Sequence, residues 1–136
     1  MTINIRPLNT NDYSDILVGW WRDWGFEAPP KDFLPEDGTS GLIVYVDDVP
    51  VCAGFIYMTN SKIAWIDWII SNKNFREKPT RIEAIKHLID TLTSMAKNLK
   101  YTYAYALIKN ERLVNIYQEV GYTKGVAYTE EMIKLL

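Results

Sequence analysis

The segment NFREKPTRIEAI, residues 74–85, brings three cationic side chains close to the expected start of a helix. The cations are Arg76, Lys78 and Arg81, and Pro79 and Thr80 lie between them. The first amides of a helix have no backbone partner, so a helix start with cations beside it suits an anionic ligand. Phosphate-binding loops usually carry glycine, which lets the backbone approach the anion, and this segment has none. The sequence therefore predicts an anion site built from side chains.

The same segment contains a competing pattern. Thr80 and Glu83 have the spacing of a capping box, which would occupy two of the first helical amides. Pro79 removes one more amide donor. A cap contributes about 1 kcal/mol, which a ligand with several charge-assisted hydrogen bonds can exceed. Two interpretations stay open: an anion site, or a loop that starts a stable helix and leaves its cations in solvent.

One carboxylate interrupts the apolar segment IAWIDWII: Asp67, which lies between Trp65 and Trp68. A carboxyl group among large apolar side chains can have a raised pKa and act as a general base, directly or through water. It can equally accept a hydrogen bond on a solvent-facing strand. His87 is expected to be exposed and Cys52 to be buried and inert. No cluster of His, Cys and acidic residues has metal-ligand spacing, so no metal is expected.

Hydrophobic periodicity predicts the elements that position these residues. Strands are expected at residues 2–7, 41–48, 51–59, 63–70 and 101–108, helices at 9–25, 80–100 and 110–121, and one or two short strands in the tail 123–136. Trp21 falls outside the apolar stripe of the first helix and is expected to be exposed. Strict alternation along the strand at 63–70 places Trp65, Asp67 and Ile69 on one face and Ile66, Trp68 and Ile70 on the other.

This order of elements is typical of an α+β protein. We expect a single domain over residues 1–136 with a mixed, mostly antiparallel sheet of six to seven strands flanked by helices. The strand at 101–108 has almost no polar interruption and is expected to be central in that sheet. The strand–helix–strand unit formed by residues 63–108 is expected to supply the parallel pair.

The bulk composition narrows the class of protein. A net charge of −2 argues against electrostatically driven nucleic-acid binding. A single cysteine cannot form an internal disulfide, which fits a reducing compartment. The first residues lack the apolar core of a signal peptide, and no apolar run approaches the roughly 20 residues of a membrane helix. We expect a cytoplasmic protein with neither a nucleic-acid nor a membrane partner.

Three segments in this order resemble the GNAT N-acetyltransferases. They are IRPLNTNDYSDI near the start, the strand–loop–helix segment from IAWIDWII to AIKHLI, and NERLVNIYQEVGY. The last is the most specific, because Asn110, Leu113, Tyr117, Gly121 and Tyr122 have the family's usual spacing. The cofactor loop departs from the family pattern. Aligned on Arg76, its two glycines are replaced by Pro79 and Arg81.

The resemblance implies acetyl-CoA as the acyl donor and a primary amine, on a small molecule or a protein, as the acceptor. Tyr117 would protonate the leaving thiolate, although its spacing also suits a core tyrosine of an amphipathic helix. Asp67 or water would be the base. The cofactor site would comprise Ile69, Ile70, Arg76, Glu77, Lys78, Pro79, Thr80, Arg81 and Asn110, and the acceptor site Trp24, Glu27 and Trp65.

The departure in the cofactor loop keeps a second interpretation open. The chain would then be a GNAT-fold protein without catalysis, which binds a protein partner or binds CoA without turnover. The oligomeric state is left as monomer or homodimer, and an exposed Trp21 would favour the dimer.

Overall fold

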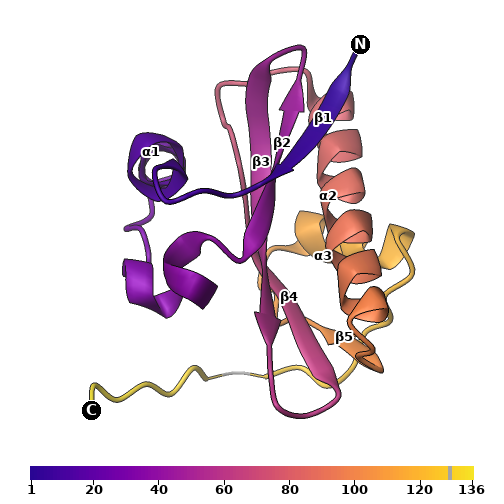
Figure 1. The fold of residues 1–136 in the computed structure, drawn as a ribbon. Helices are drawn as coiled ribbons and strands as arrows, with labels where there is room; N and C mark the ends of the chain where they lie inside the picture. Colours follow the sequence, from indigo (N-terminus) through magenta and orange to yellow (C-terminus); the bar gives the residue numbers. More distant parts are fainter. Residues whose placement is uncertain (129) are drawn as a thin grey trace.

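Residues 1–128 and 130–136, the part of the chain that the computed structural model describes, form a five-stranded sheet with helices on both faces (Figure 1). The strands are β1 (Ile3–Pro7), β2 (Gly41–Val46), β3 (Val49–Met58), β4 (Ile63–Ser71) and β5 (Tyr103–Tyr105). The α-helices are α1 (Val18–Asp23), α2 (Lys78–Asn98) and α3 (Glu111–Glu119). A π-helical turn, Tyr13–Leu17, precedes α1, and two 3-10 turns, Lys31–Phe33 and Pro35–Gly38, lie in the loop before β2. The α+β class is confirmed.

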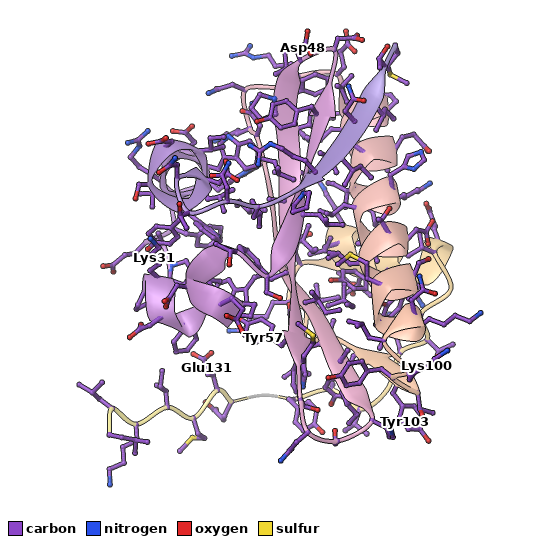
Figure 2. The ribbon with its side chains drawn as sticks, in the orientation of Figure 1. Lys31, Asp48, Tyr57, Lys100, Tyr103 and Glu131 are labelled. Carbon is purple, nitrogen blue, oxygen red and sulfur yellow. The ribbon has the colours of Figure 1, made fainter. Side chains whose placement is uncertain are left out.

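The strands lie in the order β1-β2-β3-β4-β5, with antiparallel neighbours except for the parallel pair β4–β5. The mixed, mostly antiparallel sheet is therefore confirmed, but six to seven strands is wrong, because five are found among the described residues. The strand expected to be central, β5, is a three-residue edge strand instead, and Tyr103 on it is exposed (Figure 2). The chain after Tyr105 leaves the ladder, because the amide of Leu107 bonds a side chain of β4 rather than its backbone.

The tail after α3 forms no strand over residues 123–128 and 130–136. Residues 130–136 lie below the sheet in this view and end on the α1 side (Figures 1 and 2). Val126, Met132 and Ile133 on it are exposed. The prediction of one or two short strands there is wrong, because the described residues supply no neighbouring strand to pair with this segment.

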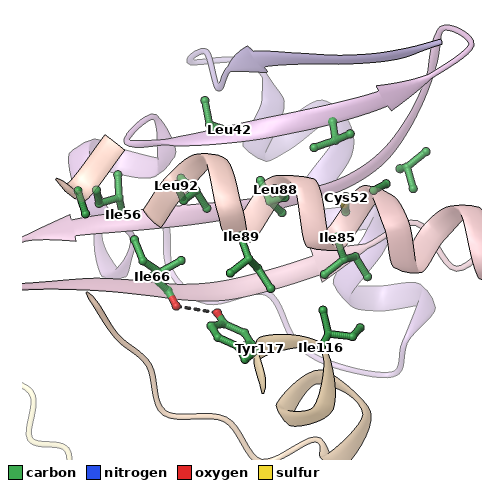
Figure 3. Packing of buried hydrophobic residues seen from close by; sticks show 14 of the residues in the cluster. Leu42, Cys52, Ile56, Ile66, Ile85, Leu88, Ile89, Leu92, Ile116 and Tyr117 are labelled. Atoms are coloured by element: carbon green, nitrogen blue, oxygen red, sulfur yellow. Dashed lines mark hydrogen bonds between the residues drawn. The ribbon is translucent and has the colours of Figure 1, made fainter. Parts of the chain in front are cut away.

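The sheet buries a different apolar set on each face, as the period of two along a strand requires. On the face of α2 and α3, a cluster includes Leu42, Val44, Ile56, Ile66, Ile85, Leu88, Ile89 and Leu92 (Figure 3). On the face of α1, a second cluster includes Leu17, Trp20, Trp21, Ile43, Phe55 and Ile70. The expected exposure of Trp21 is wrong: it is 4% exposed, because it lies one helical turn after the buried Leu17. The argument for a dimer from an exposed Trp21 falls with it.

A β-bulge in β4 breaks the strict alternation that the sequence suggested. The register shifts between the pairs Ala53–Ile70 and Phe55–Asp67, and Trp68 has φ +55°. Consequently Trp68 and Ile70 pack on the α1 face, whereas Ile66 packs on the α2 face. The predicted grouping of Ile66 with Trp68 and Ile70 is therefore wrong, because an extra residue reverses the faces beyond it.

Candidate functional site

A pocket of about 360 Å³ lies at the start of α2, and we call it the cationic pocket. Its lining residues come from three separate parts of the chain: Trp24, Lys73, Arg76, Lys78, Arg81 and Arg112. The structure therefore brings Arg76, Lys78 and Arg81 together, as the sequence led us to expect. Within residues 1–128 and 130–136, no carboxylate lies within ion-pair distance of any of the five cations. The pocket is thus a concentrated positive charge open to an anion.

The predicted capping box is wrong. α2 begins at Lys78, and the amide of Arg81 makes its first helical bond to the carbonyl of Glu77 at 2.9 Å. Thr80 therefore lies inside the first turn, and Glu83 pairs with Lys86 at 3.4 Å instead. Proline suits the first turn of a helix, which explains a start before Thr80. In the described part of the chain no side chain caps the first amides of α2, so they remain available to a ligand.

Trp24 lies in the cationic pocket, although the resemblance placed it in the acceptor site. Its indole Nε1–H donates to the carbonyl of Ser71 at the end of β4, at 2.8 Å. The Nζ atom of Lys73 and the Cζ atom of Arg81 lie 5.4 and 5.8 Å from the centre of its ring. Arg81 also donates to the carbonyl of Phe75 at 2.8 Å and so ties the loop to the helix. Trp24 therefore joins α1, β4 and two of the cations.

Sequence reasoning missed two residues of this pocket, Lys73 and Arg112. Lys73 directly precedes the segment 74–85, and this nearness in sequence is a signal that could have added it to the predicted cations. Arg112 lies at the start of α3, and no local pattern connects it with the α2 start. Glu27 is exposed in the loop after α1, outside this pocket.

The parallel ladder between β4 and β5 ends at the pair Trp65–Tyr105, whose rings lie edge to face with centres 4.6 Å apart. Just beyond this pair the backbone ladder is absent, and the carboxylate of Asp67 accepts hydrogen bonds from backbone amides instead. Its Oδ1 accepts from the amide of Trp68 at 2.9 Å, and its Oδ2 accepts from the amide of Leu107 at 3.1 Å. Burial raises the pKa of Asp67 above the ordinary carboxyl range, while the two amides act in the opposite direction. Asp67 thus bridges the opening between the diverging strands.

Tyr117 is 2% exposed and reaches the same opening from α3. Its hydroxyl donates to the carbonyl of Ile66 at 2.6 Å (Figure 3). Burial raises the pKa of Tyr117 strongly, and the charge of Asp67 raises it further. The phenol is therefore protonated at neutral pH and remains a hydrogen-bond donor. This placement is consistent with both the core role and the proton-donor role.

Asn110 serves as the N-cap of α3. Its Oδ1 accepts from the amides of Arg112 and Leu113 at 2.9 and 3.2 Å. Its side chain is thus engaged by the protein, and its structural contribution is to fix the start of α3, from which Arg112 reaches the cationic pocket. Ile69 and Ile70 lie past the bulge of β4 and face opposite sides of the sheet.

The other chemically suggestive residues lie apart from these groups. His87 is exposed on α2, and Cys52 is fully buried with a pKa raised by burial, as expected of an inert thiol. Over residues 1–128 and 130–136, no three His, Cys, Asp or Glu side chains are grouped so as to hold a metal ion. The helices of this described region also include none with the length and apolar character that crossing a membrane requires.

No protein-family model and no curated protein matches the sequence. Solved structures are similar over nearly the whole chain. A GNAT family acetyltransferase from Staphylococcus aureus has a TM-score of 0.63 and 16% identity, with 98% of this chain and 100% of that chain covered. The chain has the GNAT fold. The glucosamine-6-phosphate N-acetyltransferase from Arabidopsis thaliana has a TM-score of 0.62 and 13% identity, with 98% and 100% covered. The protein AAC(6')-Iy, in complex with the bisubstrate analogue CoA-S-monomethyl-acetylneamine, has a TM-score of 0.64 and 14% identity, with 98% and 100% covered.

Proposed function

We propose that this GNAT-fold protein is an N-acetyltransferase that uses acetyl-CoA and transfers the acetyl group directly to a primary amine in a ternary complex. The observation that carries the proposal is the cationic pocket at the start of α2. It lies at the end of β4, and the opening held by Asp67 and Tyr117 lies four residues earlier along the same strand. At about 3.3 Å per residue, these two places are roughly 13 Å apart, which an extended ligand can span.

The residues present fit the cofactor. Five cations and the free amides of α2 suit its phosphates, and the free edge of β4 past Trp65 suits an extended arm with amide groups. When bound, acetyl-CoA supplies an activated thioester. Its backbone partners on β4 would be Ile69 and Ile70, past the bulge. The loop positions of Glu77, Pro79 and Thr80 shape the start of α2, on which the cations converge.

Two groups of the chain manage the protons of the reaction. The nitrogen–carbon bond forms as the carbon–sulfur bond breaks, so the amine must lose a proton and the thiolate must gain one. Asp67, directly or through water, accepts the first because its raised pKa makes it a stronger base than an ordinary carboxylate. Tyr117 gives its proton to the thiolate after its hydroxyl leaves the carbonyl of Ile66. Trp65 and Glu27 lie on the acceptor side in this proposal.

One observation favours a second candidate function, binding of CoA or of a protein partner without catalysis. In this structure the backbone already satisfies both proton-handling groups: two amides bond Asp67, and the carbonyl of Ile66 bonds Tyr117. Catalysis requires that these bonds be exchanged, whereas binding alone does not.

The test is a calorimetric titration of the protein, freed of carried-over cofactor, with acetyl-CoA. We expect binding that weakens with salt and falls at least tenfold in the double variant Arg76→Gln, Lys78→Gln. Lys62→Gln, a distant exposed cation in the turn before β4, is the matched control and should bind as the wild type does. Absence of binding at millimolar acetyl-CoA would refute the proposal.

Turnover is then measured as thiol release with a panel of primary amines. The panel includes amino sugars and aminoglycosides, because the similar structures include a glucosamine-6-phosphate N-acetyltransferase and an aminoglycoside acetyltransferase. Release that depends on one amine supports the acetyltransferase. Tight binding without release for any amine contradicts it and favours the second candidate function.

A further inference from the structure

The cationic pocket carries more positive charge than one diphosphate group needs. Each phosphorus of a diphosphate esterified at both ends carries one negative charge, so two cations and the free helix amides balance it. The pocket offers five cations, with no ion-pair partner among the described residues. Like charges gathered without a counter-ion repel one another, so this arrangement favours a ligand with additional negative charge.

The five cations divide into two groups by their position in the chain. Arg76, Lys78 and Arg81 belong to the loop and first turn of α2, and we call them the loop cations. Lys73 and Arg112 come from the segment after β4 and from the start of α3, and we call them the outer cations. The loop cations belong to the same segment as the free amides of α2, whereas the outer cations come from other parts of the chain.

The outer cations are anchored to parts of the chain other than the start of α2. The Nζ atom of Lys73 bonds the carbonyl of Asp23 at 3.3 Å and lies over the ring of Trp24. Arg112 is held at the first turn of α3, where its amide bonds the N-cap Asn110. The same Trp24 ring also carries Arg81, so Trp24 sets the spacing between an outer cation and a loop cation. Trp24 is therefore a positioning residue for the whole pocket.

We propose that the cationic pocket recognises two separate phosphate groups on one nucleotide ligand, a diphosphate at the loop cations and a monophosphate at the outer cations. A phosphate monoester carries about −1.5 to −2 charge at neutral pH, so the two groups together carry roughly −3.5 to −4 and match the five cations. This inference rests on the proposed function. It adds that the protein selects CoA, which carries a separate 3′-phosphate, against dephospho-CoA, which lacks only that group.

The experiment compares the affinities for CoA and dephospho-CoA by calorimetry, with quenching of tryptophan fluorescence as a second readout. We expect CoA to bind the wild type at least tenfold more tightly. The double variant Lys73→Gln, Arg112→Gln should lose at least tenfold in affinity for CoA and less than threefold for dephospho-CoA. The double variant Arg76→Gln, Lys78→Gln should weaken both ligands by the same factor. Glutamine keeps most of the side-chain length, and circular dichroism confirms that each variant is folded.

Each outcome decides the inference. Equal affinity of the wild type for CoA and dephospho-CoA would overturn it and leave the proposed function intact, since CoA still binds. An equal loss for both ligands in the Lys73→Gln, Arg112→Gln variant would also overturn it, because the outer cations would then act only through general charge. If neither ligand binds, the proposed function fails as well. Lys62→Gln, at the far end of β4, should leave the selectivity unchanged.

Discussion

Replacement of Tyr117 by phenylalanine separates the structural role of this residue from its proposed chemical role. The change removes one hydroxyl, whose 2.6 Å bond to the carbonyl of Ile66 lies in the buried core. A typical hydrogen bond contributes about 1 kcal/mol, and a buried carbonyl left without its partner raises the loss to about 1–3 kcal/mol. For a chain of 136 residues this lowers the melting temperature by roughly 3–10 °C. Differential scanning calorimetry measures that shift.

The same variant should lose far more activity than stability. If Tyr117 delivers the proton to the thiolate, its removal lowers kcat by roughly 10²–10⁴-fold at a temperature where the variant is folded. Tyr122→Phe is the matched control. Its hydroxyl pairs with Thr93 at 2.6 Å, and its ring packs edge to face against Tyr117 with centres 5.0 Å apart. The control should lose similar stability and keep kcat within about threefold.

Two results would refute this reasoning. An unchanged melting temperature for Tyr117→Phe would show that the bond to Ile66 does not hold in solution. Equal and small kcat losses in both variants would show that Tyr117 is only a core residue, and the proton donor would have to be sought elsewhere.

Two further predictions concern β4 and the strand beside it. Because the pKa of Asp67 is raised, the folded state binds the carboxyl proton more tightly than the unfolded state does. The unfolding free energy of the wild type, minus that of Asp67→Asn, should therefore fall as the pH rises from about 4 through the raised pKa. Urea denaturation at a series of pH values measures this difference. A difference that grows with pH would contradict the burial of the carboxylate. Gly54→Ala should lose about 1–3 kcal/mol, because its Cβ would meet three core side chains at once: Cδ1 of Ile69 at 2.5 Å, Cδ1 of Leu92 at 3.2 Å and Cδ2 of Leu88 at 3.3 Å. Gly125→Ala, whose Cβ meets no atom of the described residues within 4 Å, should change stability by less than about 0.5 kcal/mol.

Local periodicity was sufficient to predict the main helices. The helical stripe of α2 buries Ile85, Leu88 and Leu92, and the expected stop of α3 is confirmed at Gly121, which has φ +102°. These features depend on residues close in sequence, so the sequence records them directly. The start of α2 was misjudged because Thr80 offers a plausible cap in isolation, while the proline before it allows an earlier start.

Features that depend on distant residues were beyond a local pattern. The bulge of β4 lies opposite Gly54 on β3, and nothing within β4 itself marks it. The cationic pocket needs Trp24, Lys73 and Arg112 to meet through the packing of α1, β4 and α3. The sequence could propose the loop cations for the site, because they are neighbours in the chain. It could not propose the outer cations as their partners.

The strained backbone of β4 lies where the proposed reaction needs an open strand. A bulky residue with positive φ, such as Trp68, costs on the order of 1–3 kcal/mol, so the surroundings must maintain it. The carboxylate of Asp67 accepts a hydrogen bond from the amide of Trp68. The ring of Trp68 also makes edge-to-face contacts with Trp21 and Phe33, with ring centres 6.3 and 6.1 Å apart.

On its other edge, β4 continues to Ser71 while its parallel ladder with β5 stops at Trp65. Over the described residues, positions 66–71 of β4 have no partner in β5, and unpaired strand edges bind extended chains. The free edge therefore connects the opening at Asp67 and Tyr117 with the cationic pocket. Binding of an extended cofactor arm requires only this edge and the pocket. Catalysis requires in addition that Tyr117 release the carbonyl of Ile66 and that Asp67 exchange its bonds to the amides of Trp68 and Leu107, and these exchanges separate the two candidate functions.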